Sequence, residues 1–246
     1  MQLYFIRHAQ SENNALWART QSSQGRTPDP EVTDLGHRQA EILARFLAES
    51  GPGVKPGDYD PQNRHGFGLT HLYSSLMRRA IITGTYIAEA LDLTLTAWED
   101  IHERGGIFRD EAESGERRGL AGATRAELTD TFPHLVLPET LNEAGWWNRP
   151  FETADQVPAR AQRFIEELLS RHGGTDDRVA IISHGGFYID LLAVLLDFPL
   201  QNDHLGEPKQ VVFTINNTAI TRIDVEDYVN LVYLNRVDFM PRELIT

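Results

Sequence analysis

Residues 5–14 read FIRHAQSENN, and two different kinds of sequence meet inside this stretch. The apolar run at 3–6 is typical of a strand buried in a sheet, and it ends abruptly in Arg7 and His8. Polar side chains then continue to Asn14. Ligands of open α/β sheets bind beyond the carboxyl ends of the strands, so this junction is a candidate functional site. The alternative is a strand end that merely faces solvent.

Short β-like runs alternate with helical patterns along the chain, which is typical of a mostly parallel sheet with helices on its faces. We expect strands at about 2–7, 69–74, 93–97 and 178–183, and helices at 35–49, 76–91, 157–171 and 185–196. After residue 210, the runs VVFTI, AITRI and VNLVYL indicate antiparallel edge strands. The predicted fold class is a three-layer α/β fold with a mostly parallel sheet and antiparallel C-terminal strands.

Two stretches interrupt this alternation. Residues 50–68 are rich in Gly and Pro and are expected to form a surface loop. Residues 104–150 are mixed, with a short helix expected near 124–132, and we interpret them as a lid-like insertion. The whole chain, 1–246, is then expected to form a single domain.

The insertion carries the residues that would set specificity. Its acidic start, the pair Arg117-Arg118 and the pair Trp146-Trp147 would line the mouth of a pocket. The alternative is a solvated lid with both tryptophans packed beneath it. Neither interpretation identifies a substrate.

The composition limits the classes of partner. The 36 acidic residues outnumber the 23 basic residues, and the net charge of −13 repels nucleic acid and anionic membrane surfaces. The absence of cysteine excludes disulfides, thiolate zinc sites and cysteine nucleophiles. The apolar run at 191–196 is far shorter than the roughly 20 residues that span a bilayer. No basic leader precedes the first strand, so we expect a soluble cytoplasmic protein.

Two further junctions resemble the first. The apolar run RVAII ends in Ser183 and His184, and the glycines that follow would open a helix whose N-terminus favours an anion. Residues 75–83, SLMRRAIIT, place arginine in the first turn of a helix after another strand. Taken alone, each has an ordinary explanation: a helix-capping serine beside a histidine, or a solvated Arg-Arg pair. Two strands that each deliver a histidine to the same sheet edge favour a shared site.

In this order, the pieces resemble the histidine phosphatase superfamily, whose fold is phosphoglycerate mutase-like. Residues 7–14 are similar to the signature Arg-His-Gly-(Glu/Gln)-Ser-x-x-Asn, and residues 33–40, TDLGHRQA, to the helix start that follows it. Residues 75–83 are similar to Ser-x-x-x-Arg-Ala-x-x-Thr, and 183–186 to the second histidine motif. The resemblance extends from residue 2 to about 220 and is weak over the insertion.

The resemblance implies a metal-independent phosphomonoester hydrolase that needs no cofactor and acts on a small phosphorylated substrate. His8 would be the phosphorylated nucleophile and Glu103 the proton donor. The positive pocket would consist of Arg7, Arg79 and His184, and the substrate-binding residues would be Gln10, Ser11, Asn14 and Gly185. A homodimer is an assembly that the C-terminal edge strands would allow.

Two positions test the resemblance. Ala9 stands where the family usually has glycine, and a positive φ there would cost an alanine roughly 1–2 kcal/mol. We expect a loop that accepts alanine instead. The proton donor has the nearby rivals Glu99, Asp100 and Glu111, but Glu103 follows the third expected strand, where the family's acid belongs.

Other functions stay open or are excluded by missing motifs. A mutase with the same phosphohistidine is the nearest alternative, but family mutases carry Glu-Arg-His-Tyr-Gly where this chain has Glu-Arg-Gly-Gly-Ile at 103–107. An inactive phospholigand-binding module is disfavoured because both histidines, both arginines and an acid are present. An α/β-hydrolase serine elbow, a P-loop and a His-Glu-x-x-His metal motif do not occur in the chain.

Overall fold

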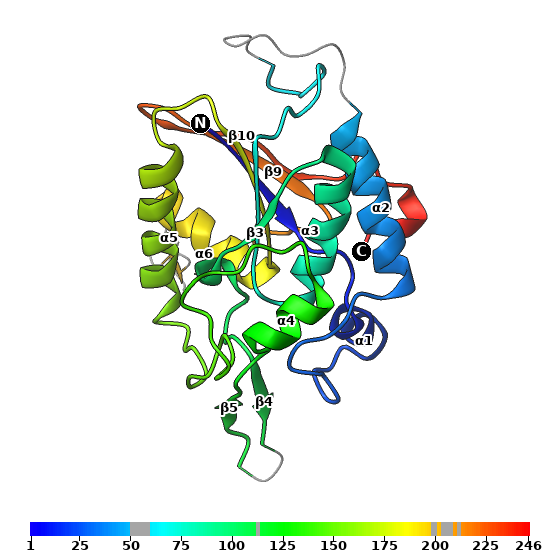
Figure 1. The fold of residues 1–246 in the computed structure, drawn as a ribbon, viewed down its shortest axis with the longest axis vertical. Helices are drawn as coiled ribbons and strands as arrows, with labels where there is room; N and C mark the ends of the chain where they lie inside the picture. The colour runs from blue at the N-terminus through cyan, green and yellow to red at the C-terminus, as the bar shows by residue number, and fades with distance from the viewer. Residues whose placement is uncertain (50–59, 112–113, 198–200, 203–208, 211–212) are drawn as a thin grey trace.

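The computed structural model describes residues 1–49, 60–111, 114–197, 201–202, 209–210 and 213–246. Its centre is a six-stranded sheet in the order β10-β9-β1-β6-β2-β3 (Figure 1). Strands β1 (Gln2–Arg7), β6 (Arg178–Ser183), β2 (His71–Ser74) and β3 (Leu95–Ala97) are parallel. Strands β9 (Ile220–Val225) and β10 (Val229–Arg236) are antiparallel to them or to each other. The predicted fold class is therefore confirmed.

Helices cover both faces of the sheet. Helices α2 (Asp34–Ala48) and α3 (Arg78–Leu91) pack on one face, and α5 (Val157–His172) and α6 (Gly185–Leu195) on the other (Figure 1). Alternate side chains of β1 enter the two cores, with Tyr4 and Ile6 on one side and Leu3 and Phe5 on the other. Each such buried apolar side chain contributes roughly 1.5–3 kcal/mol. The double burial makes β1 a rigid support for the residues that follow it.

The polar run after His8 contains a helix that the sequence interpretation did not include. Helix α1 (Glu12–Thr20) begins at a capping box, in which the Ser11 and Asn14 side chains satisfy each other's backbone N–H groups. None of its residues is buried, so no apolar periodicity marks it in the sequence. Asn14 therefore lies in the first turn of a helix rather than in a loop.

The C-terminal strands were only partly predicted. AITRI and VNLVYL form most of β9 and β10, but residues 213–215 of VVFTI are not in a strand, and 211–212 lie outside the described residues. The expected loop at 50–68 is described only from residue 60, where turns without helix or strand lead to β2. The remaining short elements are η1 (Glu99–Ile101), β7 (Gln201–Asn202), β8 (Lys209–Gln210) and η3 (Arg242–Leu244).

The segment 104–150 forms a hairpin of β4 (Phe108–Asp110) and β5 (Arg117–Gly119), followed by α4 (Arg125–Thr131). The hairpin projects beyond the sheet, next to α4 (Figure 1). Trp146 and Trp147 are each only 4% exposed and belong to the core on the α2–α3 face. The tryptophans are therefore packed beneath the segment. Among the described residues, no helix combines the length and apolar character needed to cross a membrane.

Candidate active site

Three neighbouring parallel strands end at one place and bring the predicted residues together. His8 follows β1, His184 follows β6, and Ser75 follows β2. The rings of His8 and His184 lie 5.0 Å apart between centroids, and Ser75 Oγ lies 2.6 Å from His184 Nε2. Arg79, in the first turn of α3, donates from Nε to His8 Nε2 over 3.1 Å. The sheet thus joins motifs that are more than 170 residues apart.

The hydrogen bonds of His8 define which ring nitrogen carries the proton. Nδ1 lies 2.7 Å from the Ala9 carbonyl oxygen, which can only accept, so the network assigns the proton to Nδ1. Burial lowers the pKa of His8 well below 6.5, and the cations Arg79 and Arg7 lower it further. The ring is therefore neutral at pH 7, with an unprotonated Nε2 that points toward Arg79.

Ala9 fits its position without strain. Its φ is not among the positive values found in the described residues, so an alanine costs nothing there. Its N–H donates to Thr83 Oγ1 over 3.0 Å, and that hydroxyl donates to the Arg79 carbonyl oxygen over 2.7 Å. The expectation of a loop that accepts alanine is confirmed, and Thr83 ties this loop to α3.

Two buried donor atoms in the site have no partner among the described residues. They are Arg7 Nε and His184 Nδ1. Another atom of the Arg7 guanidinium, Nη1, donates to the Ile215 carbonyl oxygen over 2.6 Å, which fixes the side chain. Because buried polar groups in proteins are nearly always hydrogen-bonded, two unpartnered donors beside His8 indicate a place for an anion.

Arg79 has a carboxylate partner that the sequence did not reveal. Asp29 Oδ1 lies 3.7 Å from Arg79 Nη1 and accepts a hydrogen bond from the Arg78 N–H over 3.1 Å. Burial raises the pKa of Asp29 to about 6, while Arg79 opposes that rise. Asp29 lies between two prolines in the sequence, and nothing in that local pattern indicates a distant arginine.

Glu103 lies against the N-terminus of α6. Its Oε1 accepts from the Arg104 N–H (2.9 Å) and the Phe187 N–H (3.2 Å), and Oε2 accepts from the Gly186 N–H (3.2 Å). A Cβ atom at Gly186 would lie 2.2 Å from Oε1, so the carboxylate fits only because that residue is glycine. Helix N-termini stabilise carboxylates in this geometry.

Two of the three rival acids have ion-pair partners elsewhere, and the third, Glu99, lies in η1, where burial raises the pKa of its carboxyl. Asp100 forms an ion pair with Arg163, and Glu111 pairs with Arg109 on the hairpin. The charge of Glu103, by contrast, affects the pKa of both Arg7 and Arg79. Of these acids, Glu103 is the one whose charge acts on the two arginines of the candidate site.

The predicted substrate-binding residues have different surroundings. Gln10 Oε1 accepts from Thr33 Oγ1 over 2.8 Å, and Ser11 caps α1. Asn14 Oδ1 accepts from Ser11, and no hydrogen bond of its Nδ2 is found among the described residues. A Cβ on Gly185 would make only an ordinary 3.6 Å contact with Arg7 Nε. Gln10 and Ser11 thus hold the loop in shape, whereas Asn14 keeps a donor available.

Asn217 is part of the site and was not predicted. Its Nδ2 donates to the His8 carbonyl oxygen over 2.8 Å and lies 3.2 Å from Asn14 Oδ1. The side chain is only 2% exposed. No recognised motif contains it, because it reaches His8 from the opposite end of the chain.

One group of three potential metal ligands occurs among the described residues: His71, His172 and Asp177. It lies at the amino ends of β2 and β6, opposite the edge where β6 leads to His184. His172 is already hydrogen-bonded on both ring nitrogens, to Tyr73 Oη (3.1 Å) and to Asp177 Oδ2 (2.9 Å). The group is therefore separate from the candidate active site.

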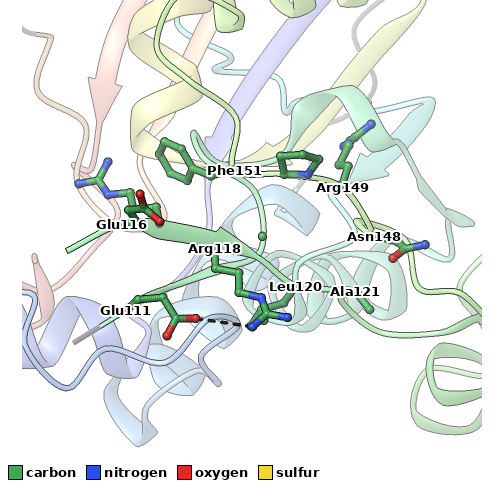
Figure 2. Close-up of a pocket in the computed structure, with 11 residues that line it drawn as sticks. Glu111, Glu116, Arg118, Leu120, Ala121, Asn148, Arg149 and Phe151 are labelled. Atoms are coloured by element: carbon green, nitrogen blue, oxygen red, sulfur yellow. Dashed lines mark ion pairs between the residues drawn. The ribbon is translucent and has the colours of Figure 1, made fainter. Parts of the chain in front are cut away.

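A groove of about 810 Å³ runs beside β5 and the segment 148–151. Figure 2 shows Arg118 and Glu111 on the hairpin and Asn148, Arg149 and Phe151 on the neighbouring segment. The predicted catalytic residues do not line it. Phe151 connects the two places, because its ring would touch a Cβ at Gly105, two residues after Glu103.

Comparison with known proteins supports the sequence resemblance. The profile of the histidine phosphatase superfamily (branch 1) matches residues 3–55 and 62–235. A putative phosphoserine phosphatase 2 of Hydrogenobacter thermophilus is 27% identical, over 96% of this chain and 95% of its own. A glucosyl-3-phosphoglycerate phosphatase of Mycolicibacterium vanbaalenii is 26% identical over 81% and 76%, and a probable phosphoglycerate mutase GpmB of Yersinia pestis 21% over 92% and 86%.

Solved structures share the fold. A mycobacterial glucosyl-3-phosphoglycerate phosphatase, solved with VO3, superposes with a TM-score of 0.57 at 19% identity, over 96% of this chain and 99% of its own. A phosphoserine phosphatase from Entamoeba histolytica, solved with 3-phosphoglyceric acid, gives 0.58 at 19% identity over 98% and 99%. At this identity the likeness concerns the fold.

Proposed function

The chain belongs to the histidine phosphatase superfamily (branch 1), and we propose that it hydrolyses phosphomonoesters through a phosphohistidine on His8. The observation that carries this proposal is the state of the His8 ring. Its Nδ1 proton is held by the Ala9 carbonyl oxygen, and its Nε2 is unprotonated in a cationic pocket. Such a nitrogen is a nucleophile held next to an anion site.

In the first step, the phosphate displaces the internal contacts of the pocket. Arg7 Nε and His184 Nδ1 supply the unpartnered donors, and Arg79 turns its Nε–H from His8 to the phosphate. His8 Nε2 then forms a bond to phosphorus while the bond from phosphorus to the ester oxygen breaks. Glu103, in its protonated form, gives its proton to the departing alkoxide.

His184 contributes a hydrogen bond more than a permanent charge. Burial lowers its pKa well below 6.5, and Arg79 lowers it further, so the ring is neutral without a ligand. The Ser75 hydroxyl can donate to Nε2, which leaves the proton on Nδ1 for the phosphate. The fixed positive charge of the pocket then comes from Arg7 and Arg79 rather than from all three predicted residues.

In the second step, water attacks the phosphohistidine. Glu103, now a carboxylate, removes a proton from the water as its oxygen bonds to phosphorus. The bond between phosphorus and Nε2 breaks, its electron pair returns to the ring, and inorganic phosphate leaves. No metal takes part in this scheme.

Hydrolysis is favoured over mutase chemistry by the residues that follow Glu103. Gly105 and Gly106 have φ of +83° and +70°, and a Cβ at Gly106 would lie 2.2 Å from the Trp147 ring. The His-Tyr pair that family mutases carry at these two positions cannot fit here without moving Trp147. Substrates in the relatives' names, phosphoserine and glucosyl-3-phosphoglycerate, are the first compounds to screen.

The test is to trap the covalent intermediate. Wild-type protein, His8→Ala and the surface control His134→Ala are mixed briefly with substrate labelled on phosphate. We expect alkali-stable, acid-labile label on wild type and on the control, and none on His8→Ala. Label that persists in His8→Ala overturns the assignment. Phosphate release from 3-phosphoglycerate, with and without 2,3-bisphosphoglycerate, separates hydrolysis from isomerisation.

A further inference from the structure

Three side chains that can bind a metal ion lie together at the amino ends of the parallel strands, away from the candidate active site. They are His71, the first residue of β2, His172, the last residue of α5, and Asp177, which directly precedes β6. One ligand atom from each lies within 4.8 Å of the other two. In the part of the chain that the structure describes, no other group of three histidine, aspartate or glutamate side chains has this spacing. The proposed hydrolysis uses none of the three residues.

Two parallel strands bring His71 and Asp177 to the same face of the sheet. Successive side chains of a strand point to opposite faces, so His71 shares a face with Tyr73, which belongs to the core on the α5 side. Asp177 stands two residues before Val179, another member of that core, and Val179 pairs with His71 across the strands. The Asp177 carbonyl oxygen accepts from the Gln2 N–H over 2.8 Å, which fixes the backbone before β6.

The turn between α5 and β6 holds His172 next to Asp177. Thr175 Oγ1 donates to the His172 carbonyl oxygen over 2.8 Å and accepts from the Asp177 N–H over 3.1 Å. The His172 side chain is only 4% exposed, whereas those of His71 and Asp177 are 40% and 27% exposed. The group is therefore anchored on the side of α5 and open to solvent on the side of His71, where an ion can enter.

The distances and the ligand types suit a zinc ion. His172 Nδ1 lies 2.9 Å from Asp177 Oδ2, and His71 Nδ1 lies 3.8 Å from Asp177 Oδ1. With metal–ligand bonds of about 2.0–2.1 Å, the ligand atoms of a tetrahedral zinc site are roughly 3.3 Å apart, so small side-chain rotations suffice. The hydrogen bond from His172 lowers the pKa of the Asp177 carboxyl, which is therefore ionised at pH 7. Imidazole ligands favour zinc over magnesium or calcium.

Tyr73 allows His172 to exchange a proton for a metal. Without a metal, the network assigns the proton to Nδ1, because the Asp177 carboxylate can only accept, and the Tyr73 hydroxyl donates to Nε2 over 3.1 Å. When a metal binds Nδ1, the proton moves to Nε2 and the same hydroxyl accepts it in a hydrogen bond. Ligating histidines usually have such a partner on their other nitrogen.

The nitrogen of His71 can become available in a similar way. Its Nδ1 lies 2.9 Å from Thr70 Oγ1, and the same hydroxyl lies 3.3 Å from the Arg178 carbonyl oxygen. A hydroxyl that donates to the carbonyl oxygen leaves the lone pair of Nδ1 for a metal ion.

We propose that His71, His172 and Asp177 bind one Zn²⁺, with a water molecule in the fourth position. The ion joins the start of β2 to the connection between α5 and β6. Because the three ligands come together only in the folded chain, the ion stabilises the native state. The site is structural and does not depend on the proposed hydrolysis.

The experiment measures zinc binding to protein that has been stripped of metal with a chelator. Calorimetry gives the stoichiometry and affinity for wild type, His71→Ala, Tyr73→Phe, His134→Ala and His8→Ala. His71 is removed rather than His172, because a partly exposed ligand is less important for packing. His134→Ala removes an exposed imidazole elsewhere and is the matched control. His8→Ala tests whether zinc binds at the candidate active site instead.

We expect one Zn²⁺ per chain in wild type, His134→Ala and His8→Ala. Tyr73→Phe should weaken the affinity roughly 10- to 100-fold, the usual effect of removing the partner of a ligating histidine, and His71→Ala at least about 100-fold. At about 100 times its Kd, zinc should raise the Tm of wild type by roughly 5–10 °C, whereas the same concentration of Mg²⁺ should not.

Three results overturn the proposal: a wild type that binds no zinc, a His71→Ala variant that binds zinc as tightly as wild type, or a loss of binding in His8→Ala. A Tm that Mg²⁺ raises as much as zinc does also overturns it. Neither calorimetry nor the thermal melt depends on turnover, so the result is the same whether or not the chain hydrolyses phosphomonoesters.

Discussion

Two pairs of histidines lie at opposite edges of the parallel part of the sheet. His8 and His184 follow the carboxyl ends of β1 and β6, with 5.0 Å between ring centroids. His71 begins β2, and His172 ends α5, with 4.5 Å between their ring centroids. Spacing and residue type are alike, so neither distinguishes a reactive pair from a structural one.

The two histidine pairs differ in their hydrogen-bond partners and in the charges around them. Asp177 accepts from His172, and that hydrogen bond lowers the pKa of the carboxyl; Tyr73 occupies the other nitrogen of His172. Around the first pair, guanidinium groups replace the carboxylate, and among the described residues one nitrogen of His184 has no partner. An imidazole with hydrogen-bond partners on both nitrogens stabilises the fold, whereas a neutral imidazole among cations is suited to attack an anion.

The largest effect on turnover is expected for a substitution at the carboxyl ends of the parallel strands. In Gly186→Ala, the new Cβ would overlap Glu103 Oε1 at 2.2 Å and displace the acid. We expect kcat to fall about 10²- to 10⁴-fold for alkyl phosphates, the usual contribution of a general acid. The fall should be smaller for p-nitrophenyl phosphate, whose leaving group needs no proton.

Gly185→Ala is the steric comparison, because its added Cβ would make an ordinary 3.6 Å contact with Arg7 Nε and would leave Glu103 in place. Steady-state rates on both substrates and a thermal melt of each variant are the measurements. A Gly186→Ala enzyme that acts on both substrates at the wild-type rate would remove Glu103 from the mechanism.

The next effect concerns stability in acid. Burial lowers the pKa of His8 and of His184 well below 6.5, so the native state binds fewer protons than the unfolded state as pH falls below that value. Each ring should then reduce the free energy of unfolding by roughly 1.4 kcal/mol per pH unit below pH 6.5 until it is protonated in the folded protein. Asp29, with a pKa raised to about 6, acts in the opposite direction below pH 6.

Urea unfolding between pH 7.5 and 5 measures this dependence. His8→Gln and His184→Gln should each make the slope shallower by about one proton, whereas the exposed control His65→Gln should not. Equal slopes in all four proteins would mean that folding does not shift the titration of these two rings, which contradicts the comparison.

The smallest effect is expected at the amino end. Asp177→Ala removes the acceptor of His172 and should lower the free energy of unfolding by about 1–2 kcal/mol at pH 7, since the carboxylate is partly exposed. Turnover should stay near wild type. The exposed neighbour Asp176→Ala is the control. A large loss of turnover in Asp177→Ala would mean that the histidine pair at the amino end also affects catalysis, which contradicts the distinction between the two pairs.

Much of the fold followed from local sequence. The strands at 2–7 and 178–183 and the four principal helices were predicted within a few residues, because burial on both faces gives continuous apolar runs and helices give a 3.6-residue period. Helix α1 has no buried face, so that period is absent, and it was missed. Residues 213–215 have the composition of a strand but not its pairing.

The sequence by itself determined which residues stand at the ends of strands. The order of the sequence places His8 and His184 directly after strands and Arg79 in a helix that follows another strand. These residues converge because parallel strands end at one edge of the sheet. The partners were decided only by the tertiary structure. Asn217 reaches His8 across 209 positions, and Asp29 reaches Arg79 from another loop. A sequence motif contains only residues that are close along the chain. The position of the proton on a histidine ring depends instead on residues that are close in space.

The stretch FIRHAQSENN predicted that His8 follows the end of a buried strand. The folded chain supplied the cations and carbonyl oxygen that make that histidine neutral, with Nε2 unprotonated. The carboxylate of Glu103 is a second example, because only the tertiary structure brings it against Gly186, a residue without a side chain. Desolvation and long-range charge are properties of the packed molecule, which is why no local motif contains them.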